Sequence, residues 1–455
     1  MKIFKEPAVP KDQMLLLPPC VDDFVGPQDP VRILSEVLDS IDSSRLYARY
    51  EGGGAPAYDP LMLLKVLVFG NCLGILSSRK LASSLRYDVR FMYLAQMGRP
   101  DFRTIARFRK NHLDTVKYLF AESVRICLTM GLVLLEHGAA DGTKLEANVS
   151  GKQTYKAERL EKKLSSIEEK IAELLLQAEE IDAQEDAEHG DAAGDEIPAE
   201  LKDLKRRKER LEAAKKALQE TGRQSVAATD LESRLMKTTA GNRPAYNAQA
   251  VVDGANQIVV AAAVTQAESD NRELAPLLEQ VEANTGGLPK QVTADGGYFS
   301  PQSLACVEEK SLDAYIPDPV SLKERNPGWE YDRENDRFMG PSGEVLTFRR
   351  KRTKRSVLYH IYRGAGTRKE VWVRQDGDRA ARMRAKMQTP EAKQVYRLRK
   401  QIVEPFFGHL KGPLNLRRLL MRGLSGATTQ YLLACTAHNM MKLAPHWSSF
   451  QAASV

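Results

Sequence analysis

Three acidic residues stand in short segments where a carboxylate could do chemistry. Asp141 lies in GAADGTKLEAN after a short apolar approach, Asp295 ends a predicted strand in QVTADGGYFS, and Glu404 lies among basic residues in YRLRKQIVEPFFGHLK. Carboxylate oxygens suit hard divalent cations, and two Mg²⁺ ions about 3.5–4 Å apart can activate water and stabilise the leaving oxygen of a phosphodiester. Taken singly, each acid is best interpreted as a solvated surface group, because the chain holds 60 Asp and Glu residues.

Other reaction classes lack their residues. The five cysteines are far apart in the sequence, whereas zinc and redox motifs need close pairs, so neither structural zinc nor a disulfide framework is expected. No G-x-S-x-G motif is present for a serine hydrolase. An aspartyl phosphatase could begin at DGT, but Ala139 stands where such enzymes, as a class, carry the first acid of a D-x-D motif.

Together, the acid-containing segments carry a resemblance. DGTK with a following AN, TADGGY and YRLRK with IVEP and FG resemble, in order, the motifs of bacterial insertion-sequence transposases of the Asp-Asp-Glu (DDE) class. The branch is the one marked by Tyr, Arg, Glu and Lys around the last acid, of the insertion sequence 4/5/1182 type. YDPLMLLKVLVFG and RPDFRTIARFRK resemble the amino-terminal helical domain of these enzymes, so the resemblance covers about residues 40–445.

The resemblance implies a fold and a reaction. It implies an α/β protein with an RNase H-like (retroviral-integrase-type) catalytic core and an N-terminal all-helical domain. Asp141, Asp295 and Glu404 would be the catalytic residues and would bind two Mg²⁺ (or Mn²⁺) ions. The activity would be a DNA transposase that cuts the ends of its element and joins the 3′-hydroxyls to target DNA. The expected partners are double-stranded DNA, as terminal inverted repeats and target, and a second protomer in a synaptic homodimer.

The segment around Glu404 departs from the family's spacing of Tyr, two residues, Arg, three residues, Glu, six residues and Lys. Glu404 and Lys411 fit this spacing, but Lys400 holds the arginine position, and Arg399 and Tyr396 each lie one residue early. Seven residues make about two helical turns, so Glu404 and Lys411 share a face about 10 Å apart along the axis. Glu404 can then bind metal while Lys411 contacts a neighbouring phosphate. Tyr396, Arg399 and Lys400 are also expected near DNA.

Proline complicates that helix. Pro405 has no N–H and its ring would clash with the carbonyl of Gln401 in a helix interior. A helix that starts at Glu404, or is kinked there, is therefore predicted.

The N-terminal part is expected to be helical. Asp59 before Pro60 is a good helix start, which predicts a buried helix over 60–76. Two further helical stretches are predicted at 77–95 and 103–131, the second with Arg103, Arg107, Arg109 and Lys110 near its start. Short helices with a basic entry are typical of a helical DNA-binding unit, although a plain helical bundle explains the pattern equally well.

The middle of the chain has the pattern of an α/β unit. Residues 245–253 and 257–266 flank GAN and predict an antiparallel hairpin. A helix after Asp270, a strand at 290–295, a helix from Pro301 and a strand around AYIPD follow. Strands that alternate with helices after a hairpin predict this fold class.

Two insertions interrupt this unit. Apolar residues step by four and three through residues 160–181, and again through 197–218 with Lys208 and Lys215 intruding. We expect 153–220 to form an antiparallel coiled-coil hairpin, with an intermolecular coiled coil as the alternative. The second insertion, 320–378, has strand-like pieces and no cysteine, so it is expected to be a small β subdomain that folds without zinc.

Charge is concentrated near the C-terminus. Residues 349–422 hold 22 Lys and Arg against five acids, although the whole chain sums only to +7. Arg349, Arg350, Lys351 and Arg352 lead this region, and aromatic residues interleave with its cations. Such composition favours contact with a polyphosphate backbone over a merely solvated basic face.

These patterns divide the chain into expected parts. They are an N-terminal segment (1–40), a helical domain (41–132), a core in three pieces (133–152, 221–319 and 379–445), the coiled-coil insertion (153–220) and the basic β insertion (320–378). No apolar run is long enough for a membrane span or a signal peptide, so a bacterial cytoplasmic, nucleoid-associated protein is expected. The rival function is a catalytically inactive DNA-binding repressor derived from a transposase.

Overall fold

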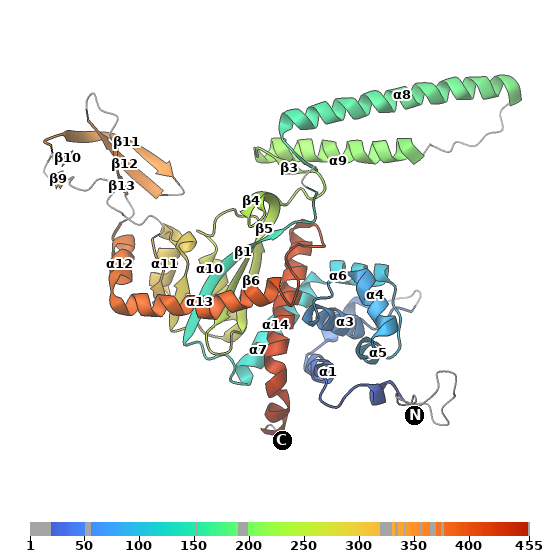
Figure 1. Cartoon of the computed structure of the whole chain (residues 1–455), viewed down its shortest axis with the longest axis horizontal. Helices are drawn as coiled ribbons and strands as arrows, with labels where there is room; N and C mark the ends of the chain where they lie inside the picture. Colours follow the sequence, from blue (N-terminus) through green and yellow to red (C-terminus); the bar gives the residue numbers. More distant parts are fainter. Residues whose placement is uncertain are drawn as a thin grey trace, which may run out of the picture.

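A mixed sheet lies at the centre of the molecule, with helices packed around it (Figure 1). The computed structural model describes residues 20–50, 56–150, 153–189, 199–318, 330–332, 335–340, 342–354, 357–364, 370–374 and 377–453. The side chains of 177–199 are outside this description, and they include the last residues of the first predicted heptad run (177–181) and the first residues of the second (197–199). The chain is therefore a mixed α/β protein with an N-terminal helical region.

The central sheet has six strands within the described residues. They are β1 (His137–Glu146), β4 (Arg234–Thr238), β5 (Gly241–Asp253), β6 (Val259–Thr265), β7 (Gln291–Ala294) and β8 (Asp313–Tyr315). β5 pairs antiparallel with β1 on one side and with β4 and β6 on the other. β7 and β8 continue the sheet beyond β1 as parallel strands. The predicted hairpin of 245–253 and 257–266 is confirmed as β5 and β6.

Helices cover the sheet. α10 (Leu274–Thr285) packs on β5 and β6, and α11 (Pro301–Glu309) packs against α10. α12 (Gly377–Gln388) leads into α13 (Pro390–Lys411), which lies across β1, β5 and β7. The helix after Asp270, the helix from Pro301 and the strand at 290–295 are confirmed as α10, α11 and β7.

The N-terminal helices are shorter than predicted. The described elements are α1 (Pro30–Ser40), α2 (Ser44–Tyr47), α3 (Pro60–Cys72), α4 (Ser78–Tyr87), α5 (Val89–Leu94), α6 (Phe102–Asn111) and α7 (Leu113–Thr129), with short 3₁₀ turns at Val21–Phe24 and Ala48–Tyr50. Asp59 caps α3 as expected, accepting from the Leu61 N–H. Each of the two later stretches is split, because Asp88 caps a new helix and His112 leaves helical geometry.

A long C-terminal helix joins the helical region to the sheet. α14 (Gly423–Ala453) contacts α3 and α7 on one side and β6 on the other (Figure 1). Its buried Asn439 side chain accepts from the Val259 N–H (2.9 Å) and donates to the Val259 carbonyl (3.0 Å). One hydrophobic cluster therefore runs from Val25 in the helical region to Trp447 in α14.

α13 accommodates Pro405 in its interior. The helix runs from Pro390 to Lys411, so the first of the two predicted arrangements, a start at Glu404, is wrong, and the second, a kink at this point, stays a prediction. Pro405 cannot donate to the carbonyl of Gln401. The Gln257 side chain donates to that carbonyl at 3.1 Å instead. A side chain from the β5–β6 turn thus replaces the missing helical hydrogen bond.

Two long helices project from the sheet where the heptads predict them (Figure 1). α8 (Ala157–His189) and α9 (Ala199–Thr221) lie side by side, and β2 (Thr154–Tyr155) pairs with β3 (Val226–Ala227) at their base. We call these four elements the hairpin. Its own apolar cluster contains mainly seam residues: Leu160, Leu164, Ile167, Leu211, Ala214 and Leu218. Ala214 takes the seam place predicted for Lys215.

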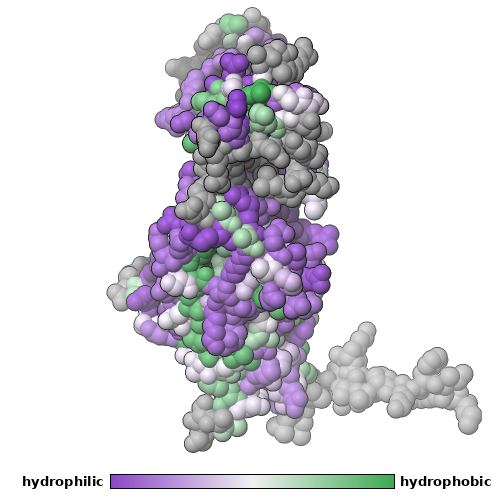
Figure 2. All heavy atoms as spheres, turned by 90° about the vertical axis from the view of Figure 1, so that its left-hand side faces the viewer, coloured by the Kyte–Doolittle hydropathy of each residue, from purple (hydrophilic) through white to green (hydrophobic). Residues whose placement is uncertain are grey.

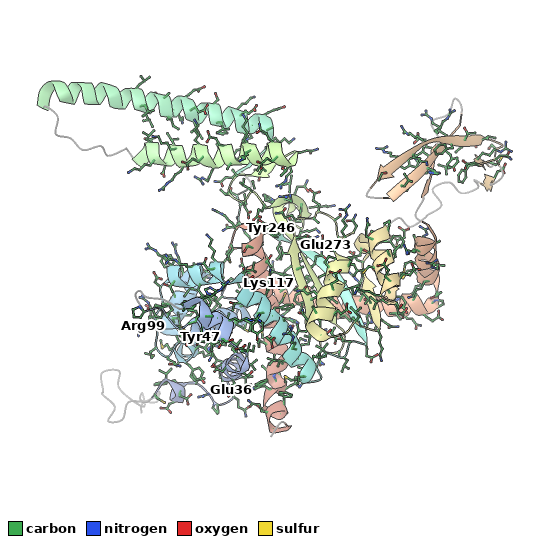
Figure 3. The ribbon with its side chains drawn as sticks, turned by 180° about the vertical axis from the view of Figure 1, so that it is seen from behind. Glu36, Tyr47, Arg99, Lys117, Tyr246 and Glu273 are labelled. Carbon is green, nitrogen blue, oxygen red and sulfur yellow. The ribbon has the colours of Figure 1, made fainter. Side chains whose placement is uncertain are left out.

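The segment that follows the hairpin, between β3 and β4, makes polar contacts with the sheet and with α14. Tyr246 of β5, near the base of the hairpin in Figure 3, donates its hydroxyl to Asp230 (2.6 Å). Glu232 accepts from the Leu424 N–H (2.7 Å) at the start of α14. The hairpin therefore has its own apolar cluster, and the segment that follows it is hydrogen-bonded to β5 and to α14.

An antiparallel sheet, with five strands in the described part of 330–374, occupies the region of the second insertion. It contains β9 (Glu330–Asp332), β10 (Arg337–Met339), β11 (Val345–Lys354), β12 (Val357–Arg363) and β13 (Glu370–Arg374). We call it the small sheet. Among its described residues, Leu346, Tyr362 and Val371 form an apolar cluster, with Phe338 packed against them.

The side of the molecule that carries the small sheet, α11 and α12 is largely hydrophilic (Figure 2). Hydrophobic residues surface there only as small areas between hydrophilic ones. In the part of the chain that the structure describes, no helix is long and apolar enough to cross a bilayer.

Candidate active site

Asp141 lies within β1, and Asp295 directly follows β7, the parallel neighbour of β1. β1 and β7 pair in parallel up to Ala140 opposite Ala294, so the two acids are the next residue on each strand. Parallel strands present the residues at their carboxyl ends at one edge of a sheet, where open α/β folds place their sites. The charge of Asp295 contributes to the raised pKa of Asp141, which agrees with this proximity. The sheet brings together two of the three predicted acids.

The backbone around both acids is held by local bonds. Asp295 caps a 3₁₀ turn, Gly296–Tyr298, by accepting from the Gly297 N–H at 2.8 Å. Asp141 accepts from the Gly142 N–H at 2.8 Å. A Cβ on Gly142 would lie 2.3 Å from Nε2 of Gln249, so any other residue at this position must displace the Gln249 amide.

A polar network lies beside the two acids. Asp270 accepts from Lys144 (3.2 Å), Asn247 (2.6 Å) and Gln249 (2.6 Å). The buried Tyr298 donates its hydroxyl to the other end of the Gln249 amide. The network therefore joins β1, β5, the loop before α10 and the turn that follows Asp295.

Asp270 also lies near Asp295. A Cβ on Gly297 would lie 2.9 Å from Oδ1 of Asp295 and 3.1 Å from Oδ2 of Asp270, so both carboxylates border this glycine. Burial raises the pKa of Tyr298 well above its ordinary value, and the charges of Asp270, Asp141 and Asp295 add to that rise. The charges of three carboxylates thus act on one buried hydroxyl.

Arg399 of α13 neutralises Asp141. Its guanidinium lies 2.8 Å from Oδ2 of Asp141, and only 7% of the arginine is exposed. Burial raises the pKa of Asp141, to about 6 with the opposing effect of Arg399 included. Arg399 was expected to contact DNA; in this structure it faces the acid, and a phosphate could reach it only if this ion pair opened.

Tyr396 and Lys411 also lie on the acid side of α13. Burial raises the pKa of Tyr396, and the charges of Asp295 and Asp141 add to the rise while Arg399 opposes it. Lys411 donates to the Thr143 hydroxyl, and burial lowers its pKa although Asp141 acts in the opposite direction. Lys411 therefore lies beside Thr143 and near Asp141, and its contact with a phosphate stays a prediction.

Glu404 does not join the other two acids in this structure. Its side chain is exposed. Among the described residues, no group of three or more His, Cys, Asp and Glu side chains could hold a metal ion. Glu404 nevertheless lies along α13 between Arg399, which reaches Asp141, and Lys411, which reaches Thr143 two residues further along β1.

The other cations expected at DNA lie on the surface. Lys400, Arg103 and Arg107 are exposed, as are the four cations of β11, Arg349 to Arg352. Arg352 lies over the Trp372 ring at 5.4 Å, and Arg350 lies 3.7 Å from Glu370. By contrast, Arg109 is buried and donates to the Leu76 carbonyl (2.7 Å), so it supports α6 from inside.

The network residues Asp270, Asn247, Gln249, Lys144 and Tyr298 were not predicted. Their sequence signal is weak but real. Every described position of β5 from Pro244 to Asp253 is buried, so Asn247 and Gln249 in AYNAQAVV needed buried partners. The register of β1 with β5 sets the neighbours of these side chains: Gly142 lies opposite Gln249, and Lys144 lies opposite Asn247.

Two family models match the chain. The transposase domain (DUF772) matches residues 19–111, and the transposase DDE domain matches residues 203–440, more than half of the chain. The chain therefore belongs to the transposase DDE domain family and is a DDE transposase of the insertion-sequence type. The second match includes Asp295 and Glu404 and begins after Asp141. No curated protein and no solved structure matches.

Proposed function

We propose that this transposase cuts phosphodiesters at the ends of an insertion sequence and joins the freed 3′-hydroxyls to target DNA. The observation that carries the proposal is the placement of Asp141 within β1 and of Asp295 directly after the parallel strand β7, one residue beyond the last β1–β7 pair, with α13 packed against both strands. DNA transposition as the activity follows from the family; the residues and the two-metal chemistry are proposed here.

The sheet supports an RNase H-like core. Its order β6-β5-β1-β7-β8 places an antiparallel three-stranded meander beside two parallel strands, with the first strand in the middle. In this arrangement the first strand carries Asp141, and Asp295 directly follows the fourth strand of the core. The hairpin and the small sheet are proposed as insertions into that core, because each has its own apolar cluster.

The donor set at the two acids suits a divalent cation. Asp141 and Asp295 offer only carboxylate oxygens, which are the ligands that hard cations prefer. The Arg399 guanidinium is already bound to Asp141 as its positively charged partner. When bound, Mg²⁺ or Mn²⁺ would supply a Lewis acid that polarises phosphate oxygens and lowers the pKa of water. Asp141, Asp295 and Glu404 would hold two such ions.

The chain's own residues then have separable tasks. Arg399 keeps Asp141 ionised and oriented despite burial. Lys411, fixed on Thr143, would hold a phosphate next to the acids. Glu404 would turn toward the sheet when Arg399 yields Asp141, since it lies on the segment of α13 between Arg399 and Lys411, which both contact β1.

The partners follow from charge. The exposed cations of β11, together with Lys400, Arg103 and Arg107, are proposed to hold the terminal repeats and target DNA as duplex. A homodimer is proposed for the complex that brings two element ends together, and the bacterial nucleoid is its proposed place of action.

The test is a cleavage assay with mapped products. Purified protein is incubated with duplex DNA carrying one end of its element, with Mg²⁺, Mn²⁺ or EDTA, and each strand is mapped at single-nucleotide resolution. We expect a 3′-hydroxyl at the element boundary with either metal and none with EDTA. DNA that is bound but never cut with either metal would favour the inactive repressor instead.

A further inference from the structure

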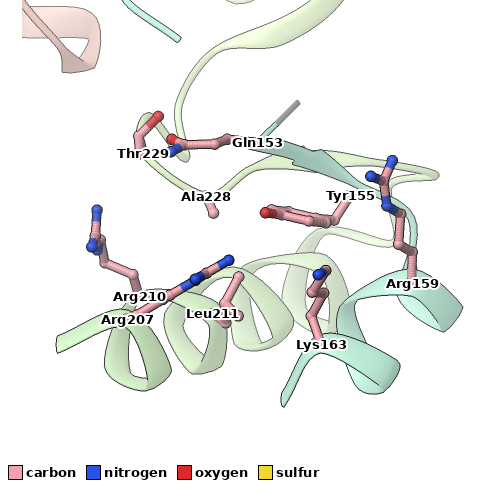
Figure 4. Close-up of a pocket in the computed structure, with 9 residues that line it drawn as sticks. All are labelled: Gln153, Tyr155, Arg159, Lys163, Arg207, Arg210, Leu211, Ala228 and Thr229. Carbon is pink, nitrogen blue, oxygen red and sulfur yellow. The ribbon is translucent and has the colours of Figure 1, made fainter. Parts of the chain in front are cut away.

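A basic cleft lies at the base of the hairpin, away from the acids. It is a cavity of about 530 Å³ between α8, α9 and the β2–β3 pair (Figure 4). Four exposed cations line it, Arg159 and Lys163 from α8 and Arg207 and Arg210 from α9, and no acid does. Gln153, Tyr155 and Thr229 form the facing wall.

The two edges of the hairpin differ in charge. On one edge, oppositely charged residues meet across the helices: Glu168 with Lys208 (2.9 Å) and Glu161 with Lys215 (3.3 Å). On the other edge, the four cleft cations face one another. Within the described part of the chain, none of the four forms an ion pair; Arg159 lies over the Tyr155 ring (5.7 Å) and Arg210 donates to the Arg206 carbonyl (3.4 Å).

Like charges that face one another across a helix pair repel, and flanking positions of a coiled coil normally carry opposite charges. One edge of the hairpin follows that rule. The other edge concentrates positive charge in a cleft, where low-dielectric walls focus the field on an anion. The unbalanced edge is thus suited to binding an anionic partner.

Cations line the cleft from two facing helices. Arg159 and Lys163 are four residues apart, about 6 Å along the axis of α8. A second cavity, lined by Arg243 and Arg418 with Glu146 also in its wall, is formed in part by residues that follow β1. Several cations at such spacing suit neighbouring phosphates of a nucleic-acid strand better than one small anion.

We propose that the cleft formed by Arg159, Lys163, Arg207 and Arg210 binds the phosphate backbone of duplex DNA, so that the hairpin is a DNA-binding arm of the transposase. The choice of ligand rests on the proposed function. Phosphate contacts position the duplex and carry no sequence information, so the arm holds DNA of any sequence.

The test compares two fourfold variants of the full-length protein. The cleft variant carries Arg159→Gln, Lys163→Gln, Arg207→Gln and Arg210→Gln. The matched control carries Lys162→Gln, Lys170→Gln, Lys202→Gln and Lys205→Gln, which removes the same charge from exposed positions of the same two helices. Affinity for a fluorescent 40-base-pair duplex is measured by anisotropy at several salt concentrations, without divalent metal.

We expect the cleft variant to bind about tenfold more weakly and to flatten the log–log salt slope by about 2–3 units, because each lost phosphate contact removes about 0.9. The control should change the slope by less than about 1 unit. Equal changes in the two variants, or an unchanged slope in the cleft variant, would overturn the proposal. Circular dichroism melting of both variants identifies any loss of the fold, and single substitutions at Arg207 and Arg210 then replace the fourfold set.

A competition arm separates DNA from free phosphates. ATP and inorganic phosphate at millimolar concentration should displace little DNA from the wild type, and equally little from both variants. Tight, cleft-dependent binding of ATP would assign the cleft to a nucleotide and reject the DNA arm. Because these are binding measurements, their outcome is independent of whether the wild type cleaves element ends.

Discussion

The acids and the cations of this transposase are held in opposite ways. Asp141 is enclosed between the sheet and α13 and paired with Arg399, and Asp270 beside it accepts three hydrogen bonds. The cations of β11 and of the hairpin cleft stand exposed on elements with small apolar clusters of their own.

Because of this difference, substitutions near the acids and substitutions among the exposed cations should have different effects. Chemistry on a phosphate requires groups fixed to within a fraction of an ångström, whereas backbone binding adds many weak, replaceable contacts. Substitutions among the acids should therefore change the cleavage rate without changing affinity, and substitutions among the exposed cations should do the reverse.

The largest effect is expected at Asp295. Asp295→Ala removes one carboxylate of the proposed metal site and should lower the cleavage rate by about 10³-fold or more, since a metal ion supplies several kcal/mol of stabilisation. DNA affinity should stay within about twofold. Single-turnover cleavage and anisotropy on the same duplex measure the two quantities. Cleavage at the wild-type rate would remove Asp295 from the site.

The enclosed network gives the next effect. Asp270→Asn removes the negative charge that holds Lys144 and weakens the hydrogen bonds that Asn247 and Gln249 donate to Asp270. The turn after Asp295, which is joined to this network through Tyr298, is then held less firmly. Groups that orient metal ligands typically contribute about 10–100-fold. We expect a cleavage rate reduced by that factor and a raised Mg²⁺ requirement. A loss as complete as that of Asp295→Ala would make Asp270 a ligand and not a support.

The exposed region is tested by neutralising Arg349, Arg350, Lys351 and Arg352 together with glutamine. If these side chains contact phosphates, the log–log salt slope of DNA binding should flatten by up to about 3 units for every sequence tested. The rate of cleavage by saturated enzyme should change little. An unchanged slope would move the DNA path to the hairpin cleft or to α6, where Arg103 and Arg107 are exposed.

Buried His438 makes the enclosed region sensitive to acid. It contacts His409 of α13 and the Gln257 carbonyl, and burial lowers its pKa to about 4. The unfolded chain binds this proton near pH 6.5, so its contribution to stability is complete above that pH and is lost as pH falls toward 4, by about 3 kcal/mol. Urea unfolding across this range should show a shallower pH dependence for His438→Gln. Parallel curves would contradict the assignment.

The smallest effect on the enclosed region is expected from removal of the hairpin helices. Replacing residues 157–222 with a short Gly/Ser turn leaves β2 and β3 able to pair and removes an apolar cluster separate from the main one. Thermal unfolding should remain a single cooperative transition with a similar midpoint. Loss of the folded state would show that the hairpin supports the sheet.

Sequence patterns predicted the elements that depend on local order. Neighbouring residues were enough to predict three features: the antiparallel pair of β5 and β6, the cap of α3 by Asp59, and the strand directly before Asp295. The seam of the coiled coil was predicted correctly at Leu160, Leu164 and Leu211, but the pattern alone did not show that Ala214 replaces Lys215 there.

Contacts set by packing were out of reach. Arg399 was expected at DNA because basic residues surround it, yet the rotation of α13 on the sheet turns it toward Asp141. The Asp270 network depends on the register of β1 with β5, which no local pattern gives. Gln257 replaces the hydrogen bond that Pro405 removes, and only the folded chain brings these two residues together.

The central claim is that Asp141, Asp295 and Glu404 share divalent cations when DNA is bound. Anomalous diffraction from crystals of the Glu404→Gln variant and of the wild type, each with element-end DNA and Mn²⁺, tests it directly. We expect two manganese peaks about 4 Å apart in the wild type. Both should contact Asp141, Asp295 or Glu404, and at least one should be lost in the variant. Manganese bound elsewhere, or Glu404 more than about 10 Å from both aspartates with metal and DNA present, would contradict the account.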